Sequence, residues 1–560
     1  MKKLILLVLL LSAPVNAWAA TVYVDPTCSN NGDGTAGTPC ASSGGAVGPK
    51  NTWVGITWTA GNTYKGQGGT SETLSSYLIG GSGTAGNLIT ITSYGTGQFT
   101  FNATASYAMA TISRSYILID NVKFQSSNTS CLYFTNATHD VTVQNSTFSL
   151  CGNGPSATTG GVTLEGGAAA GDFDNIIIQN NNFDAVYGIA VWANEIVAAN
   201  SNNWDNIQIL NNTHNNGATV SSARSIWFSI ADASTATVSR LTIRGNTISG
   251  TDNTAGVPNY RIQVTRNTHT GPTRQDRYLG LVISSNTISN SGGGIYVEHT
   301  GLYPGVQNCI CQNTLTTIRS NAAIAPWWSA GLIIEGNTIN GVTPVTAGID
   351  GAGLDLENNI EASPNNLIVR SNSISNLAGS ASVAYSGEGI INVNSTNTQI
   401  YGNVILNAKV GILSDGIAGG AGTNYISNNT IINSAVDGIW DQAFQNQGET
   451  YTNNIVYGSG RYGFNRTGVV TLATMNTNLI YGSGTNNYNN QSAHATDINT
   501  DPLLVSTTTP KTKGNSPARR AGTSGYPCID IRGRPCWSPP DIGAYQATSG
   551  DPAKTRTPRQ

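Results

Sequence analysis

The chain has 560 residues, of which only 10% are charged and 65 are glycine. Soluble globular proteins average about 25% charged residues, so Asn, Ser, Thr and Gly here take places that charges usually hold. The 27 lysines and arginines nearly balance 30 acidic residues, which leaves no basic field for a nucleic-acid partner. Glycine has no period of three, and Ile, Val and Leu recur throughout, so neither collagen nor a disordered chain fits.

The first 19 residues have the three parts of a secretory signal peptide. Lys2 and Lys3 form the basic segment, Leu4–Leu11 the apolar segment, and Ala17-Trp18-Ala19 the cleavage motif. The apolar run is too short for a bilayer, which needs about 20 residues. The sequence therefore predicts cleavage, secretion to the medium, periplasm or cell surface, and no membrane span.

Eight cysteines fall in sequence-local groups, which is typical of an oxidising compartment. Three pairs are each predicted to staple one loop: Cys28/Cys40, Cys131/Cys151 and Cys528/Cys536. Cys309 and Cys311 are separated by one residue, a spacing that is awkward for a bridge between positions on one face of a strand. For this pair a disulfide and a zinc site both stay open.

A short phrase of β-branched residues followed by Asn recurs, as in Leu241-Thr242-Ile243 before Asn246-Thr247-Ile248. Its anchors lie roughly 24 to 40 residues apart, which is the period of a solenoid. An Asn at the same corner of every coil would form a ladder of amide hydrogen bonds, at about 4.8 Å per coil. The anchors are Asn181, Asn212, Asn246, Asn286, Asn313, Asn337, Asn372, Asn403, Asn429 and Asn454.

This pattern resembles the right-handed parallel β-helix of the pectate-lyase-like superfamily over about Tyr116–Ile480. The predicted fold class is all-β, a single-stranded parallel β-helix of about a dozen coils. The C-terminal Asp541-Ile542-Gly543-Ala544-Tyr545 resembles the closing module of secreted family members. That module is structural in the family, so Arg532 and Arg534 receive no catalytic role. The predicted units are a signal peptide (1–19), an N-terminal strand, cap and first coils (20–115), the repeats (116–480), the closing module (481–547) and a flexible tail (548–560).

A second phrase, Gly-Ile-x-apolar-x, marks the strands of one sheet. Period-2 alternation sends its second and fourth residues into the coil and its third and fifth outward. The predicted third-position column is Thr163, Ala190, Trp227, Gln263, Tyr296, Ala325, Asp355, Ile391, Leu413 and Trp440. The predicted fifth-position column is Glu165, Trp192, Ser229, Thr265, Glu298, Trp327, Glu357, Val393, Asp415 and Gln442.

This outward face combines aromatic rings with carboxylates, which is typical of saccharide sites. Asp355 and Glu357 are two apart on one strand, about 6.7 Å between Cα atoms, a separation that suits an inverting hydrolase. Asp350 and Glu388 are expected nearby. The alternative is that outward carboxylates only keep the sheet soluble, but like charges so close cost energy unless a cation or a shared proton relieves them.

The candidate site is larger than this cluster. The candidate catalytic residues are Asp355, Glu357, Glu298, Arg261 and His299, with a turn role as the alternative for His299. The candidate substrate-binding residues are Trp192, Trp227, Tyr296, Trp327, Trp440, Arg266 and Lys409, although loops rather than sugars could cover Trp227 and Trp327. Arg224 also belongs to a neighbouring coil on the N-terminal side of the cluster.

The resemblance implies a polysaccharide lyase. In that family, carboxylates on this sheet bind Ca²⁺, which neutralises a uronate, and an Arg or Lys then abstracts the acidified proton. The Ca²⁺ ligands would be Asp350, Asp355, Glu357 and Glu388. Three functions compete: a lyase cleaving an acidic glycan, a glycoside hydrolase using Asp355 and Glu357, and a non-catalytic adhesive solenoid. The expected partner is a polysaccharide. No coiled-coil signal supports a trimer, so a monomer is predicted.

Overall fold

The computed structural model of the chain describes residues 19–43, 45, 47–104, 107–125, 128–135, 137–152, 160–166, 172–184, 186, 189–195, 203–215, 224–230, 236–250, 260–266, 276–344, 350–359, 367–380, 386–415, 423–442, 449–468 and 473–547. Except for residue 19, the predicted signal peptide and the predicted tail (548–560) lie outside these residues. Within the described ranges every regular element is a strand, and no helix there is long and apolar enough to cross a membrane.

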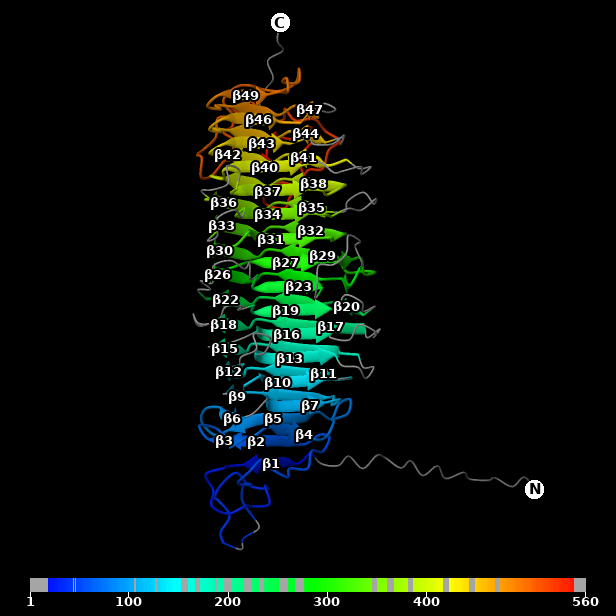
Figure 1. Ribbon diagram of the computed structural model, residues 1–560, viewed down its shortest axis with the longest axis vertical. Helices are drawn as coiled ribbons and strands as arrows, with labels where there is room; N and C mark the ends of the chain where they lie inside the picture. Colours follow the sequence, from blue (N-terminus) through cyan, green and yellow to red (C-terminus); the bar gives the residue numbers. More distant parts are fainter. Residues whose placement is uncertain are drawn as a thin grey trace, which may run out of the picture.

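The strands form three long parallel sheets, A, B and C, that run the length of the molecule (Figure 1). Each coil contributes a strand to A, then B, then C before the chain climbs to the next coil. In Figure 1 the strands of sheet C lie one above another, from β4 near the N-terminal end to β49 near the C-terminal end. The predicted right-handed parallel β-helix is confirmed.

The strands have the following bounds. Sheet A contains β1 (Thr21–Val24), β2 (Thr63–Gln67), β5 (Ile89–Tyr94), β8 (Ile117–Asp120), β11 (His139–Gln144), β14 (Asp174–Gln179), β17 (Asn203–Leu210), β20 (Thr237–Ser239), β21 (Thr242–Arg244), β24 (Tyr278–Leu279), β25 (Val282–Ser284), β28 (Thr300–Gly301), β29 (Asn308–Cys311), β32 (Leu332–Glu335), β35 (Leu367–Arg370), β38 (Thr398–Tyr401), β41 (Tyr425–Ser427), β44 (Thr450–Thr452) and β47 (Thr474–Asn476). Sheet B contains β3 (Ser71–Leu74), β6 (Phe99–Ala103), β9 (Val122–Gln125), β12 (Thr147–Ser149), β15 (Asn182–Asp184), β18 (Thr213–Asn215), β22 (Thr247–Ser249), β26 (Thr287–Ser291), β30 (Thr314–Ile318), β33 (Thr338–Val342), β36 (Ser373–Leu377), β39 (Val404–Leu406), β42 (Thr430–Ile432), β45 (Ile455–Tyr457) and β48 (Leu479–Tyr481). Sheet C contains β4 (Tyr77–Ile79), β7 (Tyr107–Ile112), β10 (Ser130–Thr135), β13 (Gly160–Gly166), β16 (Ile189–Glu195), β19 (Ile226–Ile230), β23 (Ile262–Arg266), β27 (Ile295–Glu298), β31 (Ala322–Trp327), β34 (Ala352–Glu357), β37 (Glu388–Val393), β40 (Val410–Asp415), β43 (Asp437–Asp441), β46 (Tyr462–Arg466) and β49 (Asn486–Asn489).

One apolar core fills the inside of the coils. Alternate Ile, Val, Leu and Phe residues of all three sheets point inward and are fully buried, and they form one continuous cluster from Val24 to Ile480. A single coil has too few neighbours to bury these side chains, so each coil is stabilised by the coils stacked on either side. This shared core is what holds the outward side chains of successive coils in register.

The predicted Asn ladder is confirmed at the corner between sheets A and B. The Nδ2 of Asn337 donates to Oδ1 of Asn372 in the next coil at 2.9 Å and to the Ile310 carbonyl in the preceding one at 2.8 Å. Its own Oδ1 accepts from the backbone N–H and the amide of Asn313. The same pattern runs from Asn181 through Asn478. All four hydrogen-bonding sites of the side chain are thereby satisfied in a buried place.

An aromatic stack inside the coils ends at a histidine. The rings of Phe124, Phe148, Phe183 and His214 stack in successive coils, with centroids 4.7–5.1 Å apart. His214 is fully buried, and neither ring nitrogen has a hydrogen-bond partner among the described residues. Burial, together with the nearby charge of Arg261, lowers the pKa of His214 to about 3.

Replacing His214 by Phe is expected to stabilise the protein, most of all in mild acid. In the unfolded chain His214 binds a proton below the ordinary histidine pKa of about 6.5. In the native state its ring stays neutral down to about pH 3. Wild type should therefore lose about 2 kcal/mol on going from neutral pH to about pH 5, and H214F should lack that loss. Urea unfolding of both proteins at the two pH values measures it. An identical pH dependence would show that His214 is not buried as a neutral ring.

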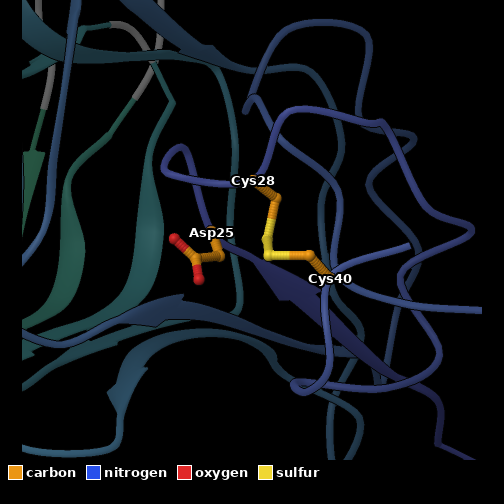
Figure 2. A group of neighbouring side chains, drawn as sticks. All are labelled: Asp25, Cys28 and Cys40. Carbon is orange, nitrogen blue, oxygen red and sulfur yellow. A yellow bond between two sulfur atoms is a disulfide. The ribbon is translucent and has the colours of Figure 1, made fainter. Parts of the chain in front are cut away.

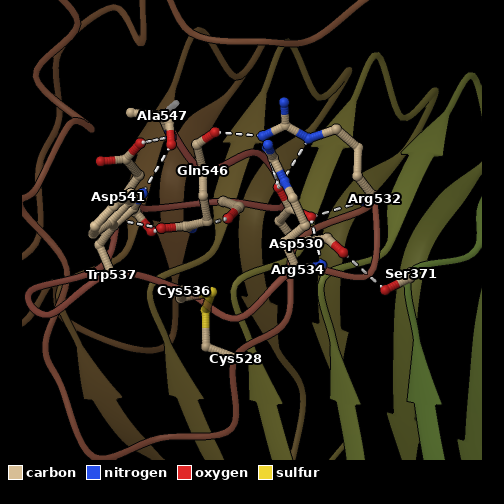
Figure 3. A network of polar contacts seen from close by, with 11 residues as sticks. Ser371, Cys528, Asp530, Arg532, Arg534, Cys536, Trp537, Asp541, Gln546 and Ala547 are labelled. Atoms are coloured by element: carbon tan, nitrogen blue, oxygen red, sulfur yellow. Dashed lines mark hydrogen bonds and ion pairs between the residues drawn. A yellow bond between two sulfur atoms is a disulfide. The ribbon is translucent and has the colours of Figure 1, made fainter. Parts of the chain in front are cut away.

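The C-terminal segment folds back onto the outside of the last coils (Figure 3). The Asp530 carboxylate accepts from the guanidinium groups of Arg532 and Arg534. Its backbone carbonyl accepts from the Ser371 hydroxyl at 2.9 Å. Nearby, the backbone N–H of Gly543 donates to the Asn453 carbonyl. Both arginines thus tie the segment together, and neither lies on the outer face of sheet C.

The three predicted loop staples are confirmed as the disulfides Cys28–Cys40, Cys131–Cys151 and Cys528–Cys536. Cys309 and Cys311 are also bonded to each other, on β29. The disulfide alternative therefore holds for this pair, and the zinc alternative does not.

Candidate active site on the outer face of sheet C

The strand register fixes which outward side chains of sheet C lie side by side. Trp227 pairs with Gln263, Gln263 with Tyr296, and Asp355 with Ile391, as the predicted third-position column requires. One coil differs from the prediction. Trp192 pairs with Thr163 and Trp227, so it belongs to the third-position column and not to the fifth. The repeated phrase is two residues out of step in that coil.

The outward face is not an open surface along its whole length. Beyond Tyr260, outward side chains of successive coils pack on one another into a second apolar cluster, separate from the inner core. Its members are Tyr260, Tyr296, Ala322, Ala325, Ala352, Ile391, Val410, Leu413 and Trp440. The alternation correctly predicted which side chains leave the coil, but side chains that point outward need not reach solvent.

Four carboxyl groups, the acid cluster, meet around β34. Asp355 has no exposed surface and Glu388 only 3%, whereas Asp350 and Glu357 are partly exposed. Asn321 links two of them: its Oδ1 accepts from the Asp350 backbone N–H at 3.0 Å, and its Nδ2 lies 3.4 Å from Asp355 Oδ2. Asp355 Oδ1 and Glu388 Oε2 are buried and have no hydrogen-bond partner within the described part of the chain.

Burial raises the pKa of every member of the acid cluster. It is the cause at Asp350. At Glu357 the charge of Asp350 adds to it. The pKa of Asp355 is raised well above its usual range by burial and then by the charges of Glu357, Asp350 and Glu388. The pKa of Glu388 is raised to about 8, mainly by burial, and the nearby Lys409 partly opposes this shift. These groups are close enough to hold protons that isolated carboxylates would lose.

Among the described residues, the four carboxyl groups predicted to bind Ca²⁺ do not form a compact group of donor atoms. Calcium takes six to eight oxygen ligands at about 2.3–2.6 Å, which requires donor atoms close together. In the described part of the chain, the one group of three or more His, Cys, Asp or Glu donors within 4.8 Å of one another is Asp25, Cys28 and Cys40 (Figure 2). Both cysteines there form a disulfide, so that group is no metal site either.

Glu298 lies apart from the acid cluster, in a buried network of its own. Its carboxylate accepts from the Tyr296 hydroxyl and, at 3.1 Å, from the backbone N–H of Arg266. Glu298 has no exposed surface and Arg266 only 8%. Both residues were predicted to face the substrate, and their burial corrects that expectation.

Arg261 and His299 are not placed for catalysis. Arg261 occupies a corner where other coils have glycine. Its guanidinium is buried and donates to the Ser291 hydroxyl at 2.8 Å and to the Gly250 carbonyl at 3.0 Å. His299 is 2% exposed and has a φ of 56°, which agrees with the alternative turn role. Corner geometry, which the alternation of strand residues does not describe, explains both differences.

Lys409 and Trp440 flank the acid cluster on its C-terminal side. The Lys409 ammonium donates to the Ser380 carbonyl at 2.9 Å. Trp440 is 5% exposed, and its indole N–H donates to the Thr467 hydroxyl at 2.8 Å. Trp440 was predicted to bind substrate, but its burial leaves little ring surface for a sugar.

Of the other aromatic residues predicted to bind substrate, Tyr296 is buried at 7% exposure, which corrects that prediction, whereas Trp192, Trp227 and Trp327 stay partly exposed. Trp327 pairs in register with Glu357, and its ring meets that of Tyr296 edge-on at 5.8 Å. Trp192 and Trp227 stack on each other at 6.1 Å, so each ring has one face occupied. Trp327 is therefore the aromatic side chain best placed beside a partly exposed carboxyl group.

Two residues of this region were missed from the sequence. Tyr260 stacks on Tyr296 at 4.9 Å, and its pKa is raised mainly by burial and further by the charges of Asp355, Glu357 and Asp350. Asn321 links Asp350 to Asp355. Tyr260 directly precedes the phrase of its coil and Asn321 stands two residues before it, so neither falls in the columns that the phrase defines.

Replacing the buried Asp355 by Asn is expected to stabilise the protein above the acid range. The folded state binds the Asp355 proton more tightly than the unfolded chain, whose aspartates titrate near pH 3.9. Asp355 therefore favours folding below that pH, and the benefit is lost as pH rises through the raised folded pKa. D355N and wild type should unfold alike near pH 3.5 and diverge towards pH 8, with D355N the more stable. The exposed Asp184→Asn is the control. A D355N protein less stable than wild type near pH 8 would mean that a bound cation balances this charge.

No protein-family model matches the chain, and no curated protein matches it. Solved structures similar to it include the GH136 lacto-N-biosidase from Eubacterium ramulus, at 9% identity and a TM-score of 0.40, over 72% of this chain and 66% of that enzyme. A pectate lyase, Pel9A, is 14% identical with a TM-score of 0.22, over 94% and 96% of the two chains. The PL6 family polysaccharide lyase from Pseudopedobacter saltans is 13% identical with a TM-score of 0.32, over 81% and 95%.

The chain thus spans slightly less than two thirds of the length of the lacto-N-biosidase. Polysaccharide lyases and glycoside hydrolases both occur among these neighbours. At such low identities the likeness concerns the fold alone, and what the chain does has to be argued from its own residues.

Proposed function

We propose that the protein is a secreted carbohydrate-active enzyme that hydrolyses a glycosidic bond on the outer face of sheet C. The observation that carries the proposal is the acid cluster, where two partly exposed carboxyl groups with raised pKa values flank a buried third. Trp327 supports a sugar substrate because its partly exposed ring lies beside Glu357 in the register of the sheet.

Glu357 is the proton donor in this proposal, and Asp350 is the base. Burial is the cause of the raised pKa of Asp350, whereas Glu357 also feels the charge of Asp350. We assign the base to Asp350, whose pKa is raised by burial alone, and the acid to Glu357, where the charge of Asp350 adds to burial in favouring the protonated form. A hydrolase needs this division of labour between an acid and a base. We propose that Asp350 activates a water molecule rather than attacking the sugar itself, as the base of an inverting enzyme does.

Asp355 and Glu388 take a positioning role. Asp355 has no exposed surface, so it cannot contact a sugar as the sequence-based hypothesis had it. Burial favours its protonated form, which adds less repulsion to its neighbours than a carboxylate would. If it were ionised, it would raise the pKa of Glu357 further.

The lyase is the competing candidate, and the geometry favours it less. Its Ca²⁺ ligands would have to converge, and the four carboxyl groups do not meet the spacing that a preformed site needs. Without that cation, carboxylates at the cleavage point repel a uronate.

The four disulfides agree with secretion into an oxidising compartment.

Digestion of a panel of neutral and uronate-containing polysaccharides, with and without chelator, tests the proposal. We expect new reducing ends, no ultraviolet absorbance from unsaturated uronate ends, and equal rates in both conditions. Unsaturated products that vanish with chelator would establish the lyase instead. A purified chain that binds a glycan of the panel without cleaving it would favour the adhesive alternative.

A further inference from the structure

A half-buried arginine, Arg224, stands on the same outer face, and no acidic residue of the described ranges pairs with it. Arg224 directly precedes the strand residues of its coil. Its Nε donates to Gln263 Oε1 at 2.6 Å, and its guanidinium carbon lies 3.9 Å from the centre of the Trp227 ring. Two neighbouring coils thus hold the guanidinium in one position, because the aromatic face and the amide fix it from different sides.

This arrangement leaves the charge of Arg224 without a carboxylate partner among the described residues. Partly exposed arginines elsewhere on the molecule behave differently: Arg240 pairs with Asp205, Arg370 with Glu335 and Arg461 with Asp437. Burial lowers the pKa of Arg224, so keeping the charged guanidinium in this place costs free energy of desolvation. A guanidinium that is held in place and short of acceptors is suited to a bidentate anion.

We propose that Arg224 binds the carboxylate of an acidic sugar residue, at a distal subsite of the glycan groove. The inference rests on the proposed function for the path of the substrate. Arg224 belongs to the coil of β19 and Asp355 to that of β34, with the coils of β23, β27 and β31 between them. At about 4.8 Å per coil, the two points lie about 19 Å apart along the sheet.

The acid cluster and Arg224 therefore favour different kinds of sugar residue. The acid cluster at the cleavage point disfavours a uronate, whereas Arg224 favours one several residues away. Between them the outward Gln263 is partly exposed and carries no charge. The substrate class is a heteroglycan with a neutral sugar at the bond that is cleaved and an acidic sugar towards the N-terminal end of the solenoid.

Binding measurements on the inactive E357Q protein test this without turnover. The probes are a short oligogalacturonate that covers the Arg224 subsite without reaching the acid cluster, and the same oligomer with its carboxyl groups reduced to alcohols. Calorimetric titration gives the affinities, and the tryptophan fluorescence reports binding near Trp227. We expect the acidic oligomer to bind about tenfold or more tightly than the reduced one. Adding R224Q should remove that preference, and adding R224K should restore it only in part.

The exposed Arg244→Gln on sheet A is the matched control and should keep the full preference. Circular dichroism melting should show that all variants are folded. An R224Q protein that still prefers the acidic oligomer, or an E357Q parent with no preference, overturns the inference. The two proposals fail separately. If R224Q loses the preference but the wild type cleaves no polymer, only the proposed hydrolase activity is refuted. If the wild type cleaves a polymer but R224Q keeps the preference, only the proposed subsite is refuted.

Discussion

Replacing Glu357 by Gln is expected to lower kcat on a cleaved glycan by about 10²–10⁴-fold, while the thermal unfolding curve hardly moves. The amide keeps the shape of the side chain but has no proton to give to the leaving sugar oxygen, and general acid catalysis contributes about that factor. Because Glu357 is partly exposed and its pKa is raised, removing its charge should not destabilise the fold. Initial rates at saturating substrate measure the effect.

Glu165→Gln is the matched control for this experiment. Glu165 is a partly exposed carboxylate on β13, in the fifth-position column predicted for Glu357, and it lies several coils away from the acid cluster. It should keep wild-type turnover. Full activity in E357Q, or an equal loss in both variants, would refute the assignment of Glu357 as the proton donor.

Replacing Asn337 by Ala is expected to lower the free energy of unfolding by about 3–4 kcal/mol. The substitution removes two donors and an acceptor from a buried corner directly behind the candidate site. It takes the donor from the Ile310 carbonyl and the acceptor from both nitrogens of Asn313, of which Nδ2 keeps its second bond, to the Ile283 carbonyl. Each buried polar group left unsatisfied costs about 1–3 kcal/mol, and large effects of single substitutions arise in this way. Urea unfolding followed by circular dichroism measures it.

Asn340→Ala in the same coil is the control. Asn340 is exposed on sheet B, and its Oδ1 accepts from the Asn376 amide at 2.8 Å. Because water can replace that partner, the loss should stay below about 1 kcal/mol. Equal losses in the two variants would mean that the burial of the ladder amides adds nothing to the free energy of unfolding.

Sequence patterns fixed the architecture because each pattern has one physical cause. Asn246 and Asn286 recur where a buried corner needs four hydrogen bonds satisfied, and that requirement identified the ladder. Ile262 and Val264 alternate with outward residues because a strand has two faces. Both regularities arise from contacts between neighbouring coils, so the repeat in the sequence was enough to predict the stacked coils.

The candidate site was predictable only as a region. The alternation showed that Asp355 leaves the coil, but its burial depends on packing above the sheet, and no periodic signal records that packing. Trp192 moved by one column because its coil lacks the usual phasing. The Arg261 side chain lies buried in the corner because this large residue stands where other coils have glycine. Each difference comes from a departure from the repeat, which is where functional residues are expected.

Proton magnetic resonance of the sugar end formed in the first minutes of digestion tests the central claim most directly. A base that activates a water molecule while the acid protonates the leaving oxygen predicts hydrolysis with inversion, so the new reducing end should first appear in the anomeric configuration opposite to that of the bond cleaved. An initial product with retained configuration would contradict the assignment of Asp350 as the base. An unsaturated end with no new anomeric signal from hydrolysis would contradict the account as a whole.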